Sequence, residues 1–280
     1  MKIIRNSIEL SKTLLGTSRS IGFIPTMGAL HKGHLSLIET SIKECQITVV
    51  SIFVNPKQFS PNEDLDKYPR NEKNDIALLN SLAVDFLFIP SFDEIYSDDY
   101  TIKIQSESLF KVLEGNARPG HFDGVLAVVC RLLNIVQPNY LYLGKKDAQQ
   151  LKIIQNMIED FSLKIIVQGC QIIRDNDGLA LSSRNRYLSI KERGLATSIY
   201  SALGMSHKYF LLGERKVGKL TNIFVDNLAP GLEKSIDYVS IVNVNDFEQC
   251  DDIIVDNSLL LVALFVGDTR LIDNVELKLK

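Results

Sequence analysis

Two of the four histidines in this 280-residue chain lie three positions apart, in the run His31-Lys32-Gly33-His34. A helix beginning near Gly33 would place both imidazoles on the same side of its first turn. There they would lie beside backbone N–H groups that lack partners within the helix and favour an anion such as phosphate. Gly28 and Gly33 would let the backbone approach that anion without a Cβ clash. The alternatives are an exposed helix decorated by histidines, or a metal-binding pair.

The segments on either side of the run favour a site for nucleotide phosphates over these alternatives. The short apolar run 21–24 predicts a buried strand before it. Leu35, Ile38 and Ile42 recur at helical spacing after it. A strand, a glycine-bearing turn and a helix form the arrangement that places phosphates at a helix N-terminus.

Two amide side chains follow a second apolar run, 47–54. Asn55 ends this predicted strand, Pro56 prevents its continuation, and Gln58 comes two residues later. The carboxyl ends of strands in open parallel sheets are where ligands bind. Amides donate and accept hydrogen bonds, which suits a substrate with hydroxyls and a carboxylate. An ordinary polar turn is the alternative.

Three more polar segments could contribute charged groups. Segment 114–124 contains three glycines and a proline, which predicts a loop from which Arg118 and His121 could face an anion. Lys145 and Lys146 follow another predicted strand, where an ammonium can contact phosphate oxygens. The alternatives are a mobile surface loop for the first segment and solvated lysines for the second.

The third polar segment, 177–185, begins with an Asp-Gly turn and continues with Ser182, Ser183 and Arg184. Such a loop can close over a triphosphate, where its arginine would neutralise charge on the leaving group. It can equally be an ordinary interdomain linker.

The elements that must position these residues indicate an α/β fold. Up to about residue 180, short apolar strands alternate with amphipathic helices, which predicts a Rossmann-like, doubly wound parallel sheet covered on both faces. Predicted strands cover residues 21–24, 47–54, 84–89, 140–143 and 164–167, and predicted helices cover 6–17, a segment from about 33, 71–82, 125–136 and 147–160. After residue 184 come predicted helices at 189–210 and 217–228 and strands at 238–242 and 259–266. We therefore expect a domain over residues 1–180 and a smaller α+β domain over residues 181–280.

Composition bounds the class of protein. Hydrophobic residues make up 45% and charged residues 23%, and the net charge of −3 supplies no basic field for nucleic acid. No apolar run reaches membrane-spanning length. The N-terminus does not read as a signal peptide. The four cysteines are scattered and favour free thiols in a reducing compartment, so we expect a cytoplasmic protein that binds neither membrane nor nucleic acid.

Seven stretches together resemble the pantothenate synthetase (pantoate–β-alanine ligase) family over nearly the whole chain. They are PTMGALHKGH, VSIFVNPKQF, DLDKYPR, EGNARPGHFDGV, QPNYLYLGKKDAQQL, DGLALSSRNRYL and GDTRLIDN. HxGH alone would indicate only the wider nucleotidylyl-transferase superfamily, which shares the motif with class I aminoacyl-tRNA synthetases. The resemblance implies the HxGH nucleotidylyl-transferase type of sheet and a C-terminal lid domain. It also implies a two-step reaction: ATP and pantoate form pantoyl adenylate and pyrophosphate, and β-alanine then displaces AMP to give pantothenate.

The resemblance also implies the site residues. The ATP site would comprise Met27, Gly28, Ala29, Leu30, His31, Lys32, Gly33, His34, Gly144, Lys145, Lys146, Asp147, Ile173, Leu181, Ser182, Ser183 and Arg184. The family designates His34 as catalytic, and we expect His31, Lys146 and Arg184 to act with it by stabilising charge. Gln58 and Gln150 would bind pantoate, and from its position at the end of a strand we expect Asn55 to bind substrate as well. Family members use Mg²⁺ with ATP and are typically homodimers, and we expect no metal held by the protein itself.

Two positions depart from the family pattern. Lys145 stands where the family usually has Glu, and Leu181 stands where Met is common. The competing hypotheses are another adenylyl transferase of this fold that makes no amide, and a non-catalytic nucleotide-binding module. A tRNA synthetase is disfavoured because the chain lacks an anticodon-binding domain and net basic charge.

Overall fold

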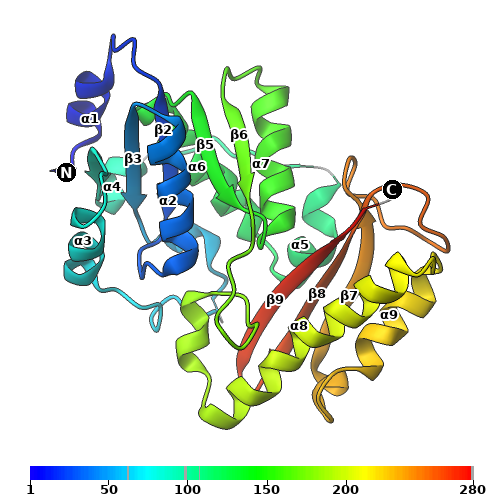
Figure 1. The fold of residues 1–280 in the computed structure, drawn as a ribbon. Coiled ribbons are helices and arrows are strands. Elements are labelled where there is room, and N and C mark those ends of the chain that lie inside the picture. The colour runs from blue at the N-terminus through cyan, green and yellow to red at the C-terminus, as the bar shows by residue number, and fades with distance from the viewer. Residues whose placement is uncertain (62, 98–99, 107, 279–280) are drawn as a thin grey trace. The chain divides into compact units, whose positions relative to one another are not determined.

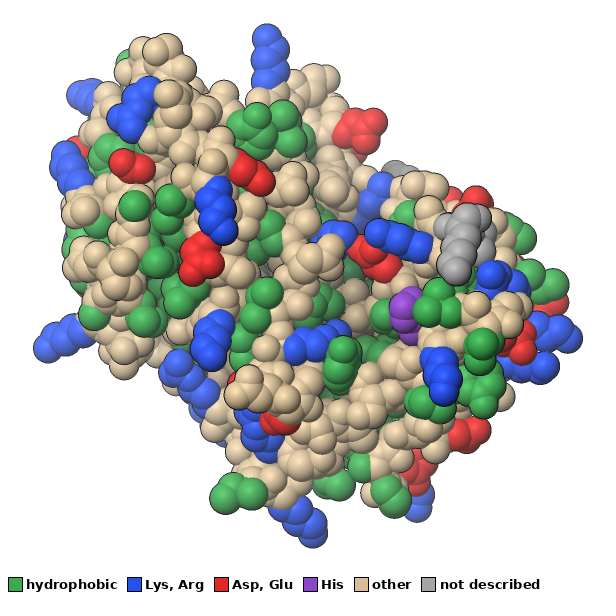
Figure 2. Space-filling view, in the orientation of Figure 1, with side chains coloured by type: hydrophobic (Ala, Val, Ile, Leu, Met, Phe, Trp, Pro, Cys, Tyr) green, Lys and Arg blue, Asp and Glu red, His purple; other side chains and the backbone are tan. Residues whose placement is uncertain are grey.

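The structure, a computed structural model, describes residues 1–61, 63–97, 100–106 and 108–278. They fall into two compact units: unit 1 comprises residues 1–145 and 149–171, and unit 2 comprises residues 146–148 and the chain from residue 172 onward. Within the described ranges, no helix combines the length and apolar character needed to cross a membrane. Basic and acidic side chains are interspersed over the face drawn in Figure 2.

Unit 1 is built on a six-stranded sheet whose strands are all parallel. The strands are β1 (Lys2–Ile4), β2 (Ile21–Thr26), β3 (Ile47–Ile52), β4 (Phe86–Phe88), β5 (Tyr140–Gly144) and β6 (Ile166–Cys170). Their order across the sheet is β1-β4-β3-β2-β5-β6. The chain therefore builds outward in opposite directions from β2 and β5, as in a doubly wound fold, and the expected fold class is confirmed.

Helices cover both faces of this sheet. They are α1 (Ser7–Leu14), α2 (Lys32–Glu44), α3 (Glu72–Asn80), α4 (Phe92–Ile95), α5 (Leu113–Ala117), α6 (His121–Val136) and α7 (Ala148–Asp160). Helix α2 runs along β2 and β3 (Figure 1), and one buried cluster joins Leu37 and Ile38 of α2 to Ile24 and Val50 of the strands. Phe23 and Val49 alternate with these strand residues, so they point to the other face. Both are fully buried, and α6 contacts β2 as well.

Unit 2 is a three-stranded antiparallel sheet with two helices. It comprises α8 (Ile190–Leu211), α9 (Val217–Asp226), β7 (Ile236–Asn243), β8 (Ser258–Val266) and β9 (Thr269–Leu277). The two helices contact each other and the strands (Figure 1). Its core joins Leu203 of α8 and Phe224 of α9 to Leu260 and Val262 of β8. Side chains cap a helix in each unit, since Asn6 caps α1 and Ser189 forms a capping box with Glu192 at α8.

Three local expectations were wrong. Segment 114–124, expected as a loop, contains the end of α5 and the start of α6, because its glycines interrupt helical structure only at Gly120, where φ is +82°. Strand β6 lies two to three residues later than expected. It is an edge strand with polar and glycine positions at its end, which hide the apolar signal. Strands β1 and β9 had not been expected.

One close approach inside unit 1 fixes the turn that follows β3. This turn is a 3-10 helix, Pro56–Gln58, and α6 contacts it. A Cβ on Gly124 of α6 would overlap the Lys57 carbonyl group and the Gln58 backbone nitrogen. A glycine is therefore needed at this point of α6 even though it lowers helix propensity.

We expect Gly124→Ala to lower the free energy of unfolding by about 1–3 kcal/mol, because the backbone of the turn must move to make room. Gly204→Ala in α8 is the matched control: nothing lies within 4 Å of its added Cβ. Better helix propensity should raise stability there by up to about 1 kcal/mol. Urea denaturation of both variants measures the difference, and a stabilised Gly124→Ala protein would contradict the close approach.

Candidate functional site

The expected site residues of unit 1 lie at the carboxyl ends of three neighbouring strands. The HxGH run follows β2, and the amides of Asn55 and Gln58 follow β3. Gly144 ends β5, and Lys145 comes directly after it. Strand β2 pairs with both β3 and β5, and the order of the sheet reverses between β2 and β5. Ligands of open α/β sheets bind in the crevice at such a reversal, so the topology alone points to this edge.

The loop between β2 and α2 passes through two residues with left-handed backbone. The φ angles are +78° at Gly28 and +51° at Ala29. Glycine adopts this conformation readily, whereas the Cβ of alanine is crowded by it. Thr26 Oγ1 accepts a hydrogen bond from the Gly28 N–H at 3.1 Å and donates one to the Ser51 carbonyl oxygen at 2.8 Å. The start of the loop is thereby tied to β3.

Asp75 of α3 holds the rest of this loop, although sequence reasoning gave it no role. Its carboxylate is 1% exposed, and its two oxygens accept hydrogen bonds from the N–H groups of Ala29 and Leu30, both at 2.9 Å. A buried carboxylate that receives two backbone donors fixes both peptide groups. One signal could have revealed it: Asp75 lies four residues before Leu79 on the buried face of an amphipathic helix.

His31 and His34 cap the helix that they begin. The Gly33 N–H donates to His31 Nδ1 at 3.2 Å, and the His31 N–H donates to His34 Nδ1 at 3.4 Å. The ring centroids lie 4.0 Å apart, which confirms that both imidazoles share one side of the first turn. The expectation of unpaired N–H groups beside them was wrong for His31 and Gly33. Those donors are satisfied by the imidazoles themselves.

This geometry assigns the tautomers of both rings. A backbone N–H can donate only to an unprotonated ring nitrogen, so each Nδ1 is an acceptor. With Nδ1 accepting, the ring N–H of each imidazole is on Nε2. The motif thus presents two N–H donors from side chains at the N-terminus of α2, where the helix dipole also favours negative charge.

The amide of Gln58 has a fixed orientation because Asn55 holds one end of it. Asn55 Nδ2 donates to Gln58 Oε1 at 3.2 Å and to the Gly124 carbonyl oxygen at 3.0 Å. Asn55 Oδ1 accepts from the Lys57 N–H and from the Tyr96 hydroxyl at 3.1 Å. Asn55 is fully buried, and these four bonds use its whole hydrogen-bonding capacity. Gln58 Nε2 therefore points the other way, 3.2 Å from Met27 Sδ, a weak acceptor.

The backbone of Gln58 is held by a second chain of contacts. His121 Nδ1 donates to the Gln58 carbonyl oxygen at 2.8 Å, and Arg118 Nη1 donates to His121 Nε2 at 3.0 Å. Burial and the neighbouring guanidinium lower the pKa of His121 to about 4, so the ring is neutral at pH 7. Arg118 also forms a bidentate pair with Glu63. The structure thus places Arg118 and His121 as supports of the Gln58 turn, rather than facing an anion as we had considered from sequence.

Strand β5 and helix α7 carry the remaining site residues of unit 1. The Lys145 N–H donates to the Cys170 carbonyl oxygen at 2.9 Å. The aliphatic part of the Lys145 side chain lies along Gly169, 3.5 Å from where a Cβ would be. Gln150 lies in the first turn of α7, half-buried.

The other expected ATP contacts belong to unit 2. These are Lys146, Asp147, Ile173 and the segment Leu181 to Arg184. The Leu181 N–H donates to the Ile173 carbonyl oxygen at 3.0 Å, which closes a hairpin over residues 173–181. Ser182 caps the 3-10 helix Ser183–Tyr187 by accepting from the Arg184 N–H at 3.3 Å. Leu181 to Arg184 therefore form an ordered turn within unit 2 rather than the interdomain linker considered from sequence.

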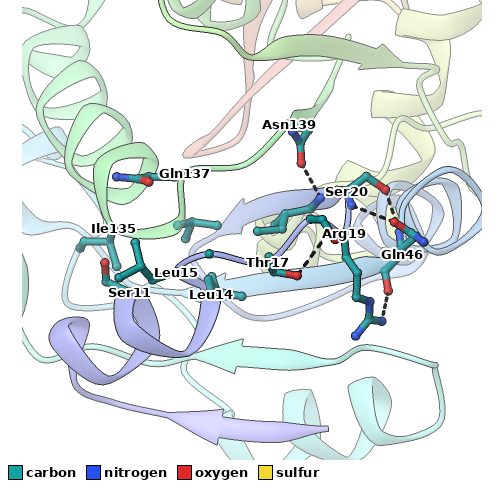
Figure 3. Close-up of a pocket in the computed structure, with 14 residues that line it drawn as sticks. Ser11, Leu14, Leu15, Thr17, Arg19, Ser20, Gln46, Ile135, Gln137 and Asn139 are labelled. Atoms are coloured by element: carbon teal, nitrogen blue, oxygen red, sulfur yellow. Dashed lines mark hydrogen bonds between the residues drawn. The ribbon is translucent and has the colours of Figure 1, made fainter.

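A separate hollow of about 320 Å³ lies at the opposite edge of the sheet, where β2 and β5 begin (Figure 3). Asn139 Oδ1 accepts from the Ile21 N–H there, and Arg19 donates to the Gln46 carbonyl oxygen. The described residues that line it include none of the expected site residues. Because ligands bind at the carboxyl rather than the amino ends of such strands, the edge bearing the HxGH loop is the candidate site.

Comparison with known proteins assigns the chain to a family. The family model for pantoate-beta-alanine ligase matches residues 2–276. The pantothenate synthetase of Campylobacter hominis is 46% identical over 275 residues, covering 98% of this chain and 99% of that protein. The pantothenate synthetase of Caldicellulosiruptor saccharolyticus is 45% identical over 267 residues, and this match covers 95% of each protein.

Solved structures agree with the sequence comparisons. The crystal structure of pantothenate synthetase from Thermus thermophilus matches with a TM-score of 0.94 at 39% identity, over the whole of both chains. The pantoate-beta-alanine ligase of Francisella tularensis, complexed with beta-gamma ATP and beta-alanine, matches at a TM-score of 0.79 and 36% identity. That match covers 98% of this chain and 97% of the other. The fold, the HxGH loop and these relatives together show that this chain belongs to the pantoate–β-alanine ligase family.

Proposed function

We propose that this protein ligates pantoate and β-alanine to pantothenate with ATP as the energy source. In the first step, the pantoate carboxylate attacks the α-phosphate of ATP, and pyrophosphate leaves. In the second step, the amine of β-alanine attacks the acyl carbon of pantoyl adenylate, loses a proton, and AMP leaves. Support comes from family membership and from one arrangement: the HxGH loop follows β2, the oriented amide of Gln58 follows the neighbouring strand β3, and Gln58 Nε2 lies 3.2 Å from Met27 Sδ of that loop.

His31 and His34 would contact the triphosphate through their Nε2–H groups. Attack of a carboxylate on phosphorus requires stabilisation of negative charge rather than a proton acceptor. N–H donors at a helix N-terminus provide it. We therefore assign His34 an electrostatic and hydrogen-bonding role, with His31 beside it.

Gln58 and Gln150 would bind pantoate. Because Asn55 donates to Gln58 Oε1, the other end of the amide, Nε2–H, faces away from Asn55 and would donate to a hydrogen-bond acceptor of the ligand. The carboxylate and hydroxyl groups of pantoate satisfy this requirement. Asn55, whose bonds are all internal, would act by orienting Gln58 rather than by touching the substrate.

The cationic groups of unit 2 would complete the ATP site. We assign phosphate contacts to Lys146 and Arg184, with Ser182 and Ser183 beside them. The ammonium and guanidinium neutralise charge that builds up on the departing pyrophosphate. In this proposal, residues 1–180 bind ATP and pantoate, and residues 181–280 form a lid.

Mg²⁺ is proposed as the companion ion of ATP, carried on phosphate oxygens. Among the described residues, no cluster of three His, Cys, Asp or Glu side chains could hold a metal ion, and no step here uses one held by the protein. We also propose a homodimer, as is typical of the family. A reducing, cytoplasmic location fits the free thiols of Cys45, Cys130, Cys170 and Cys250.

Isotope exchange tests the proposed reaction. A carboxylate activated as an adenylate returns labelled pyrophosphate to ATP. We expect exchange that requires pantoate and Mg²⁺ but not β-alanine, and AMP release that requires all three substrates. Exchange without any acid would contradict the mechanism, and pyrophosphate release without β-alanine-dependent AMP formation would favour an adenylyl transferase that makes no amide.

Asp75→Asn tests the support of the ATP loop. The variant replaces one acceptor of a backbone N–H with an NH₂ group, so one buried donor loses its partner. We expect the free energy of unfolding to fall by about 1–3 kcal/mol and the KM for ATP to rise roughly tenfold, an effect near 1.4 kcal/mol. Asp160→Asn, an exposed position at the end of α7, is the control and should change neither. An unchanged ATP KM in Asp75→Asn would show that the loop does not depend on this carboxylate.

Lys145 and Lys146 are adjacent and chemically alike, yet they belong to different units. Lys146→Ala should lower the adenylation rate at least about 100-fold, because a phosphate-facing ammonium is hard to replace. Lys145→Glu restores the usual family residue and should leave the rate within about threefold, below about 0.7 kcal/mol. Single-turnover adenylation at saturating ATP and pantoate compares the two. If Lys145→Glu is the impaired variant, the phosphate ligand is misassigned.

A further inference from the structure

Two adjacent polar residues are buried in the middle of strand β9. Asp273 and Asn274 are 5% and 4% exposed, respectively. They lie in a strand whose other buried positions include Leu271 and Leu277. Burial of a carboxylate and an amide is costly unless each is fully hydrogen-bonded. The pair therefore needs an explanation beyond core packing.

Asp273 holds the hairpin that precedes Ser182 to Arg184. Its two oxygens accept hydrogen bonds from Arg174 Nη1 at 2.6 Å and Nη2 at 2.9 Å. Arg174 Nη1 also donates to the Gly178 carbonyl oxygen, and its guanidinium lies 4.1 Å over the ring of Tyr200. Arg174 thus ties the turn of the hairpin over residues 173–181, at Gly178, to its first strand, and the planar, bidentate pair with Asp273 ties that strand to β9.

Asn274 holds a different segment. Its Nδ2 donates to the Lys146 carbonyl oxygen at 3.0 Å. This bond helps explain why residues 146–148 group with unit 2, although the residues on both sides of them belong to unit 1. The backbone of Lys146 is thus attached to β9.

Because side chains alternate between the two faces of a β-strand, the dipeptide Asp273-Asn274 can hold the hairpin and the Lys146 segment at once. Adjacent residues of a strand point to opposite faces. Asp273 pairs with Val262, which belongs to the core shared with α8 and α9, whereas Asn274 pairs with Leu261. The hairpin is therefore attached from one face of the sheet, and the Lys146 segment from the other.

We propose that Asp273 and Asn274 are positioning residues that set the spacing between Lys146 and the Ser182–Arg184 turn. The inference rests on the proposed function, in which both segments contact the phosphates of ATP. Neither residue touches substrate in this proposal. Asn274 acts through the backbone of Lys146, and Asp273 acts through Arg174. The structure thus assigns the alignment of two phosphate contacts to one rigid strand.

A double-mutant cycle separates positioning from simple stabilisation. The dissociation constant for ATP is measured by calorimetry for the wild type, Asn274→Leu, Lys146→Ala and the double variant. Asn274→Leu should weaken ATP binding about tenfold when Lys146 is present and less than about twofold when Lys146 is Ala. The KM for pantoate in the exchange reaction should stay within about twofold of the wild-type value.

A second double-mutant cycle, with Arg184 in place of Lys146, tests Asp273. Asp273→Asn should weaken ATP binding several-fold in the wild-type background and less than about twofold when Arg184 is Ala. Arg174→Lys keeps the charge but loses the bidentate geometry, so it should resemble Asp273→Asn.

Ser206→Ala is the control for damage to unit 2. Ser206 is fully buried in α8 and donates to the Leu220 carbonyl oxygen, so its loss lowers stability without touching either phosphate segment. It should leave ATP affinity unchanged. If Asn274→Leu does not fold, Asn274→Asp, which is similar in size and cannot donate when ionised, takes its place.

The outcomes distinguish this inference from the function on which it rests. Absence of pantoate-dependent exchange in the wild type would overturn the proposed function. If the wild type does catalyse pantoate-dependent exchange, two results would overturn the positioning role. One is that Asn274→Leu raises the ATP dissociation constant by the same factor whether residue 146 is Lys or Ala. The other is that Asn274→Leu leaves ATP affinity unchanged. Non-additive effects, with normal affinity in Ser206→Ala, would establish the positioning role.

Discussion

The shape of the nucleotide loop depends on one buried carboxylate. Asp75 accepts both N–H groups of a turn that would otherwise be unfavourable, because Ala29 has a left-handed backbone. The turn delivers the chain to His31, whose imidazole begins α2. A loop held in this way is formed before any ligand arrives, so little binding energy is needed to order it.

The amide after β3 is supported on the same principle. Its side chain is oriented by Asn55 and its carbonyl by the neutral ring of His121. Each of these residues is buried, and each has its donors and acceptors engaged by neighbours in the described structure. Fully satisfied buried networks specify one arrangement strongly, since any rotation leaves a polar group without a partner. The cost of burying these groups is thus offset by a defined orientation of Gln58.

Prediction from sequence was most successful where chemically distinctive residues lie next to segments with clear strand or helix periodicity. HxGH lies between a clear strand and a clear helix, so the loop, the doubly wound sheet and the side shared by the imidazoles could all be predicted. Asp75 and Tyr96 were missed because each supports the site through contacts distant in sequence, which local periodicity does not report. Strand β9 was missed for a related reason: Arg270, Asp273 and Asn274 break the apolar pattern of a strand. Its polar positions are occupied by long-range partners that the pattern cannot show.

Because residues 146–148 group with unit 2, the two units cannot be separated by a single cut in the chain. The chain passes from one unit to the other at residues 145/146, 148/149 and 171/172, so neither unit is a single continuous stretch of polypeptide. A cut at 171/172 would separate the Lys146 carbonyl from the Asn274 amide that binds it. Recombination between homologous genes at that junction would therefore combine the Lys146 segment of one protein with the β9 strand of another. The Lys146 segment and strand β9 therefore belong to one structural unit although they lie on opposite sides of that junction in the sequence.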